Sequence, residues 1–192
     1  MQPTREQAWE WLKEYTKSEA LRRHALTVEG CMRHFAALAG EDAELWGVVG
    51  LLHDLDYEQY PDEHCKKVQE ILREKDVDPA IIRAVASHGF GICSDIEPES
   101  RMEKTLYAID ELPGLIPAAA IMRPSKSVMD LELKSVKKKY KTPSFAAGVN
   151  RAIIEQGAQR LGTTVDELIP QCILGMRECA PAIGLAGDAP EA

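Results

Sequence analysis

Several features are scarce in this chain of 192 residues, and each scarcity argues against a class of protein. The five cysteines form no Cys-x-x-Cys pair, which argues against a zinc ribbon and a disulfide framework, so we expect reduced thiols. No apolar run reaches the roughly 20 residues of a membrane-spanning helix, and the N-terminal residues lack a signal-peptide pattern. We therefore expect a cytoplasmic protein without a membrane partner.

Basic residues are also in the minority. The chain has 23 Lys and Arg against 31 Asp and Glu, and its formal net charge of -8 argues against an extended nucleic-acid surface. Positive charge gathers only in residues 123–141, where we interpret the Lys137-Lys138-Lys139 run as a solvated helix face. An anionic ligand therefore needs a local site, and Arg123 and Lys126 are the best placed candidates to contact it.

Alternation of apolar and polar residues typical of strands is missing, whereas apolar residues recur at spacings of three and four. The pattern predicts an all-α fold whose length fits one domain. We expect an N-terminal helix and metal-binding core in 1–122, a helical extension of the same domain in 123–180, and a flexible tail in 181–192. The predicted helices within these parts include 4–15, 18–40, 42–54, one beginning at Pro61, 78–89, Phe145 to Leu161 and Val165 to Glu178.

Histidine and aspartate interrupt the apolar stripes of five predicted helices. One such residue alone is more often a hydrogen-bonded core group than a metal ligand. Six together favour one or two divalent ions of Mn, Fe, Co, Ni or Zn, because a metal neutralises buried imidazoles and carboxylates jointly. The six candidates are His24, His53, Asp54, His64, His88 and Asp110. His34 follows His24 by ten residues, about 280° round the helix, so we do not expect it to bind.

The order of His24, the His53-Asp54 pair and the distant Asp110 resembles the HD superfamily of metal-dependent phosphohydrolases, over about residues 20 to 122. The resemblance implies an all-helical bundle in which these four residues bind a first ion. His64 and His88 match the positions that hold a second ion in two-metal members, with Asp54 as the bridge. The resemblance also implies a function: a metal-bound hydroxide attacks the phosphorus of a small phosphorylated molecule, such as a nucleotide.

Two other functions stay open at this point. One is a di-iron oxygenase on the same scaffold, similar to myo-inositol oxygenase, and the other is a regulatory or binding protein that the metals only stabilise. For a hydrolase, the residues that we expect to act on the substrate are Asp54, Asp56, Arg123 and Lys126. Tyr57 and Glu111 flank ligands and are candidates to orient them or to act as acid and base. The sequence leaves open whether the protein forms a homo-oligomer.

Overall fold

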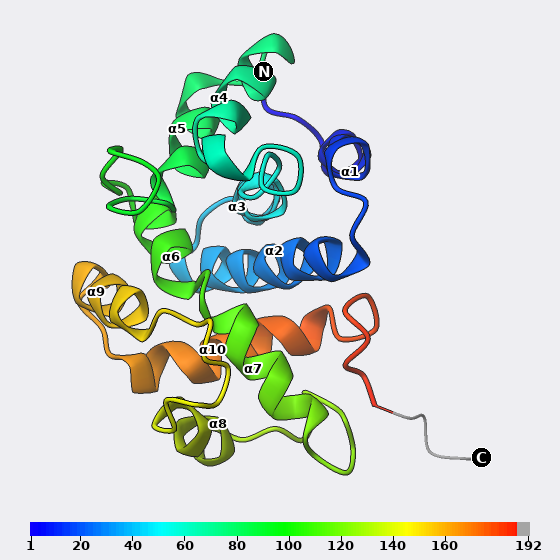
Figure 1. Ribbon diagram of the computed structural model, residues 1–192, viewed down its shortest axis with the longest axis vertical. Coiled ribbons are helices and arrows are strands. Elements are labelled where there is room, and N and C mark those ends of the chain that lie inside the picture. The colour runs from blue at the N-terminus through cyan, green and yellow to red at the C-terminus, as the bar shows by residue number, and fades with distance from the viewer. Residues whose placement is uncertain (188–192) are drawn as a thin grey trace.

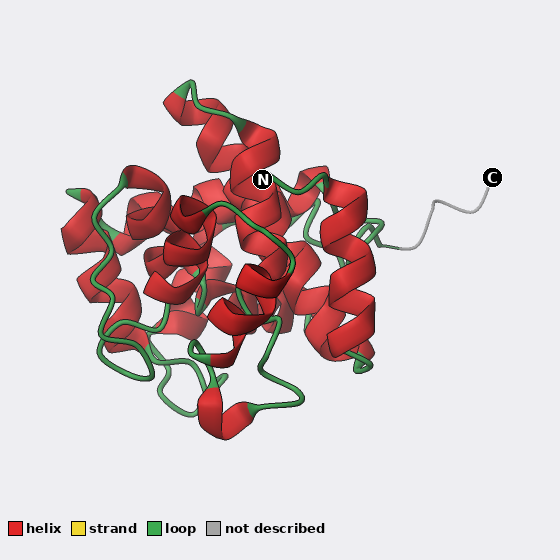
Figure 2. Ribbon diagram, turned by 90° about the horizontal axis from the view of Figure 1, so that it is seen from above, coloured by secondary structure: helices red, strands yellow, loops and turns green. Residues whose placement is uncertain are grey.

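The fold is built from helices alone. The computed structural model describes residues 1–187, and over this range it contains ten α-helices and no strand, as Figure 1 and Figure 2 show. This confirms the predicted all-α class. In chain order the helices are α1 (Arg5–Tyr15), α2 (Glu19–Ala39), α3 (Ala43–Leu52), α4 (Lys67–Glu74), α5 (Pro79–Ser87), α6 (Arg101–Ile109), α7 (Leu112–Ile121), α8 (Leu133–Tyr140), α9 (Arg151–Leu161) and α10 (Val165–Glu178).

Helix α2 is the centre of the fold. The Ser18 side chain accepts a hydrogen bond from the Leu21 N–H and starts the helix, and Gly40 ends it in the left-handed conformation with φ 68°. Its buried residues pack against α3 on one side and α10 on the other, and Figure 1 shows it running between these two helices. The helix predicted between Ser18 and Gly40 is thus confirmed.

Three helices end at residues of the predicted metal site. Helix α3 ends one residue before His53, α5 one residue before His88, and α6 one residue before Asp110. Side-chain caps from Asp42, Asp78 and Ser100 fix where the three helices begin. The carboxyl ends of these helices carry partial negative charge, which favours a cation nearby.

Two helix starts differ from the sequence prediction. The helix predicted from Pro61 is a 3₁₀ turn, Pro61–Glu63, and α4 begins only at Lys67. Cys65 adopts φ 65°, a left-handed conformation that an α-helix does not contain, so His64 lies on a turn. The helix predicted from Phe145 begins at Arg151, because residues 143–149 form turns instead.

The chain after α10 also departs from its prediction. Ile183 and Leu185 are buried, and the Leu185 carbonyl accepts hydrogen bonds from the Val128 N–H at 2.9 Å and the Ser127 hydroxyl at 3.0 Å. The predicted flexible tail therefore does not include residues 181–187, and its remainder, 188–192, lies outside the described residues. None of the described helices is long and apolar enough to cross a membrane.

Candidate metal centre

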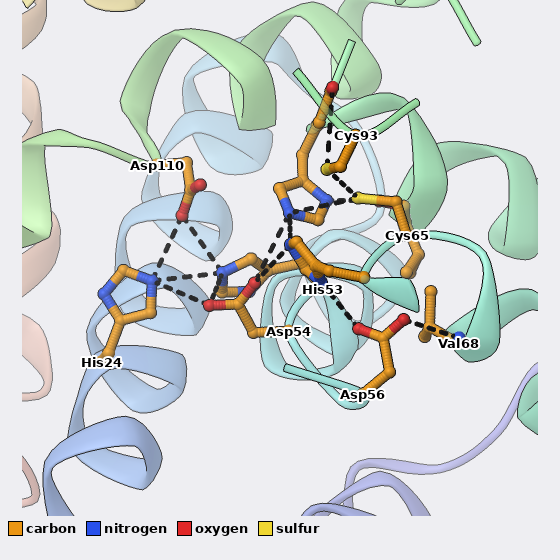
Figure 3. A network of polar contacts seen from close by, with 12 residues as sticks. His24, His53, Asp54, Asp56, Cys65, Val68, Cys93 and Asp110 are labelled. Atoms are coloured by element: carbon orange, nitrogen blue, oxygen red, sulfur yellow. Dashed lines mark hydrogen bonds and ion pairs between the residues drawn. The ribbon is translucent and has the colours of Figure 1, made fainter. Parts of the chain in front are cut away.

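The six predicted ligand residues meet at one cavity of about 550 Å³. Five of them line it: His24 from α2, Asp54 after α3, His64 from the turn before α4, His88 after α5 and Asp110 after α6. His53 is fully buried and lies directly against them. Residues separated by as many as 86 positions are thus brought within contact distance, as Figure 3 shows for His24 and Asp110.

A first set of ligand atoms consists of His24, His53 and Asp110. The two Nε2 atoms lie 3.1 Å apart, and Asp110 Oδ1 is 3.2 Å from the first and 3.1 Å from the second. Donor atoms about 2.1 Å from one ion lie roughly 3 Å from each other, so these spacings fit a shared ion. The donor set of two imidazoles and a carboxylate is one that first-row transition metals accept.

A second set lies on the other side of Asp54. His64 Nε2 and His88 Nε2 are 3.2 Å apart, and each is 3.4 Å from Asp54 Oδ1. The other carboxylate oxygen, Oδ2, faces the first set at 3.3 Å from His53 and 3.7 Å from His24. Asp54 therefore presents one oxygen to each pair of histidines, so its carboxylate could contact an ion held by either pair.

The orientation of the imidazole rings is set by their outer nitrogens. His53 Nδ1 lies 2.7 Å from the Gly50 carbonyl, and His88 Nδ1 lies 2.6 Å from the Val85 carbonyl. Because a carbonyl only accepts hydrogen bonds, both Nδ1 atoms must carry hydrogen. In the neutral ring, Nε2 then presents its lone pair to the cavity, as metal ligation requires. The site therefore fits divalent metal ions, because the Nε2 lone pairs of His53 and His88 point into it.

The charges in the cavity compensate one another. Burial works against protonation of His53, but the carboxylates of Asp54 and Asp110 outweigh it and raise the pKa of His53 well above its usual range. Burial likewise works against the charged form of the two aspartates, yet the neighbouring imidazoles lower the pKa of both. The site therefore favours positive charge, which either a proton or a metal ion can supply.

Metal binding is expected to strengthen as the pH rises above about 6.5, the ordinary pKa of histidine, because the pKa of His53 and that of His88 are both raised. Burial also works against protonation of His88, but its hydrogen bond to Asp54 and the charges of Asp110 and Asp54 together raise its pKa, so protons compete with metal for His53 and His88 below these pKa values. As pH rises the protons leave, and each proton displaced on binding changes the affinity about tenfold per pH unit. Calorimetric titration with Mn²⁺ in buffers of different protonation enthalpy measures how many protons are released on metal binding. An affinity for Mn²⁺ that does not change with pH would contradict this expectation.

Asp56 lies behind His64, where it does not line the cavity. It is fully buried; its Oδ1 accepts from His64 Nδ1 at 2.7 Å and its Oδ2 accepts from the Val68 N–H at 2.8 Å (Figure 3). The structure thus places this residue, predicted to act on the substrate, where it orients a ligand. The Val68 contact ties the carboxylate to the start of α4 and so fixes His64 although it lies on a turn.

Replacing Asp56 by alanine is expected to weaken the binding of a second ion by about 10- to 100-fold, because His64 loses the partner that fixes its ring. The first set of ligands contacts neither Asp56 nor His64, so its affinity should stay close to that of the unchanged protein. Stepwise metal titration of the variant measures the affinities of the first and the second ion. Asp62→Ala, on the exposed 3₁₀ turn, is the matched control; equal weakening of both ions would contradict the positioning role.

The other residues singled out in the sequence lie in different places. Tyr57 and Glu111 line the cavity. Arg123 forms an ion pair with Asp130 at 2.7 Å beyond the end of α7, Lys126 is exposed, and neither lines the cavity. Ten residues of α7 carry the chain about 15 Å along its axis after Asp110, which separates the two basic residues from the metal site. His34 contacts Gln171 and Glu178 of α10, outside the cavity.

Two features of the cavity have no counterpart in the sequence prediction. Cys93 lines the cavity, and its sulfur lies 2.9 Å from that of Cys65, which in turn lies 3.9 Å from His88 Nε2. The hydrogen bond between the thiols lowers the pKa of Cys93 to about 6. The second feature is a wall from the extension, formed by residues 146–153. The position of Cys65 directly after His64 is the only sequence signal for the thiol pair.

Comparison with known families gives one result. A model described as HD domain matches residues 21–113, which include all six candidate ligands. The matched segment ends before the wall that residues 146–153 contribute. No curated protein and no solved structure matches the chain.

Proposed function

This chain belongs to the HD superfamily, and from that premise we propose that it is a metal-dependent phosphohydrolase that cleaves a phosphoester or phosphoanhydride of a small molecule. The observation that carries the proposal is Asp54, which directs one oxygen to His24 and His53 and the other to His64 and His88. HD proteins bind divalent metals and are mostly phosphohydrolases, and this chain has two clusters that could hold such ions, one of His24, His53 and Asp110 and one of His64, Cys65 and His88.

In this proposal the six candidate ligands would hold two ions. His24, His53 and Asp110 would hold the first, His64 and His88 the second, and Asp54 would touch both. Divalent ions, when bound, supply positive charge to a phosphoryl group and lower the pKa of water from about 15.7 toward 7. The buried Nδ1 contacts keep the imidazoles in place, and the helix ends that precede His53, His88 and Asp110 stabilise positive charge.

The cavity lining restricts what the substrate can be. Among the described residues that line it, no lysine or arginine is present, so ions in the centre would have to bind the phosphoryl group. The side chains of Ile92, Val149 and Ile153 offer an apolar surface beside the ligands, and Tyr57 adds an aromatic ring 5.2 Å from that of His64. We therefore expect a substrate that joins one phosphorylated end to an uncharged or aromatic group, as a nucleotide does.

The experiment that tests this proposal is a release assay. Nucleotides, dinucleoside polyphosphates and sugar phosphates are incubated with the protein and Mn²⁺, or with Fe²⁺ under anaerobic conditions, and phosphate or nucleoside release is measured. Asp54→Asn is the control for contaminating phosphatases. Release that disappears in the variant supports the proposal, while equal release by the two proteins, or none from the whole panel, contradicts it.

The apolar wall also fits a second candidate function, that of a di-iron oxygenase. An uncharged substrate would suit a cavity whose described lining lacks cationic side chains, and the same six ligands would hold two iron ions. Iron content alone does not distinguish the two functions. Dioxygen consumption coupled to substrate loss would favour the oxygenase, and its absence alongside phosphate release would favour the hydrolase.

Replacing His64 by alanine is expected to remove a second ion and to leave the first. His64 Nε2 faces Asp54 Oδ1 and His88, but it makes no contact with His24, His53 or Asp110. Metal analysis after equilibration with excess Mn²⁺ and desalting should show the content falling by about half. Loss of both ions together would mean that the two sets act as one site.

A further inference from the structure

Two cysteines from distant parts of the chain meet beside the second pair of histidines. Cys65 directly follows His64, and Cys93 lies in the loop that begins immediately after His88. Their sulfur atoms are 2.9 Å apart, and Figure 3 shows the pair next to the ligand cluster. Because a disulfide bond is about 2.05 Å long, the sulfurs need to approach by only roughly 0.9 Å to become bonded.

The backbone around the pair brings the two thiols together. Cys65 has φ 65°, a conformation that few side chains adopt, and it directs the sulfur inward, where the residue is fully buried. The loop turns back because the N–H groups of Cys93 and Ser94 both donate to the Gly89 carbonyl. Both sulfurs pack on Gly89: a Cβ there would lie 2.3 Å from the Cys93 sulfur and 2.5 Å from that of Cys65. Only glycine leaves room for the pair.

The two thiols differ in their access to solvent. Cys93 is partly exposed and lines the cavity, so a small oxidant that enters the cavity reaches its sulfur. Cys65 is fully buried, and its sulfur lies 2.9 Å from that of Cys93. Of the other three cysteines, Cys31 and Cys172 are buried in the core, and Cys179 packs against α2 at Gly30. The arrangement has one thiol placed to react first and a second placed to resolve the product.

We propose that Cys65 and Cys93 form a reversible disulfide that weakens metal binding by His64 and His88, with a peroxide as the oxidant. The Cys93 sulfur attacks a peroxide oxygen, the O–O bond breaks, and one water leaves, which gives a sulfenic acid. The Cys65 sulfur then attacks the Cys93 sulfur, the S–O bond breaks, and a second water leaves. Two thiols thus lose two electrons and two protons while hydrogen peroxide becomes two waters, and a dithiol reductant reverses the change.

The effect on metal binding follows from the covalent neighbours of the cysteines. A disulfide moves Cys65, whose peptide bond fixes His64, and pulls on the loop that leaves His88. The first set of ligands lies on the far side of Asp54 and contacts neither cysteine. The disulfide should therefore lower the affinity of the second ion and spare that of the first. This part rests on the proposed two-ion site; formation of the disulfide does not.

The test uses the full chain treated with stoichiometric hydrogen peroxide. After alkylation of the remaining thiols and digestion, mass spectrometry should show one crosslinked peptide pair that contains Cys65 and Cys93. Its mass should be two units below the sum of the two unmodified peptides, and dithiothreitol should release the two peptides. Cys93→Ser should abolish the crosslink, whereas Cys179→Ser, the matched control, should retain it. A Cys93 oxidised to sulfenic or sulfinic acid without a crosslink to Cys65 would overturn the proposal.

The metal readout separates regulation from catalysis, since it requires no turnover. Mn²⁺ titration of the reduced and the oxidised protein should show the second ion weakened at least tenfold by oxidation and the first unchanged. In Cys65→Ser/Cys93→Ser the two titrations should coincide. If oxidation leaves both affinities as they were, or weakens both equally, the disulfide does not control the second ion, whatever reaction the protein catalyses.

Discussion

Replacing Asp54 by asparagine should abolish turnover and most binding of metal while helical content is retained. The carboxylate faces four imidazoles, with one oxygen toward each pair, at 3.3 to 3.7 Å. An amide keeps the shape of the side chain but replaces one of these oxygens by an NH₂ group, which cannot bind a cation. Losing about 5 kcal/mol of transition-state stabilisation lowers the rate by about 10³- to 10⁴-fold.

The measurements for Asp54→Asn are turnover of whichever substrate the release assay identifies, metal content, and the far-ultraviolet circular dichroism spectrum. Asp62→Asn makes the same chemical change at an exposed position and should behave as the unchanged protein in all three. An Asp54→Asn protein that keeps full activity would eliminate the two-ion arrangement, and one that has lost its helical spectrum would show a structural role instead.

Gly157→Ala, at a position that does not line the cavity, should destabilise the protein by about 2 kcal/mol, although alanine favours helices over glycine by about 1 kcal/mol. A Cβ at this position of α9 would lie 2.3 Å from Ala108 Cα and 2.6 Å from Ala108 Cβ, so α6 and α9 would have to move apart. Overpacking costs of about 1–3 kcal/mol are usual, and here the obstacle is backbone that cannot turn aside. Because Asp110 directly follows α6, metal affinity should also fall.

Denaturant unfolding of Gly157→Ala measures the change in the free energy of unfolding. The matched control is Ala152→Gly, at an exposed position in the first turn of the same helix, where only the helix preference applies and a loss of up to about 1 kcal/mol is expected. Helix propensity alone predicts opposite signs for the two variants, whereas close packing of α6 on α9 predicts that both destabilise. A stabilised Gly157→Ala protein would contradict this account of the helix pair.

The sequence predicts that the candidate ligands lie close together, because all of them except His64 lie on or directly after a helix with a regular apolar pattern. His53, His88 and Asp110 close helices whose starts are marked by Asp42, Asp78 and Ser100, so helical periodicity sets the direction of their side chains. The type of element around His64 was predicted wrongly because the left-handed Cys65 interrupts the pattern. No propensity scale anticipates such a conformation at cysteine, because residues other than glycine rarely adopt a positive φ.

Features that depend on how distant segments pack could not be predicted from the sequence pattern. Arg123 follows Asp110 closely in the chain, but the direction of α7, which Figure 1 shows leading away from α6, takes it from the cavity. The contact between Cys65 and Cys93 joins residues 28 positions apart, with no periodicity to suggest it. In both cases the deciding factor is the path of the chain between two helices, which local propensities do not fix.

The wall formed by residues 146–153 has a consequence for how selectivity could change. Its turn is held by the Asn150 N–H, which donates to the Glu111 carboxylate at 2.9 Å, one residue after the candidate ligand Asp110. The ligands lie within the matched domain, whereas this wall lies outside it. Exchanging the turn would therefore alter which molecules fit without touching a metal ligand. This part of the cavity lining can therefore be changed separately from the candidate ligands, whereas Tyr57 and Ile92 line the cavity from within the matched segment.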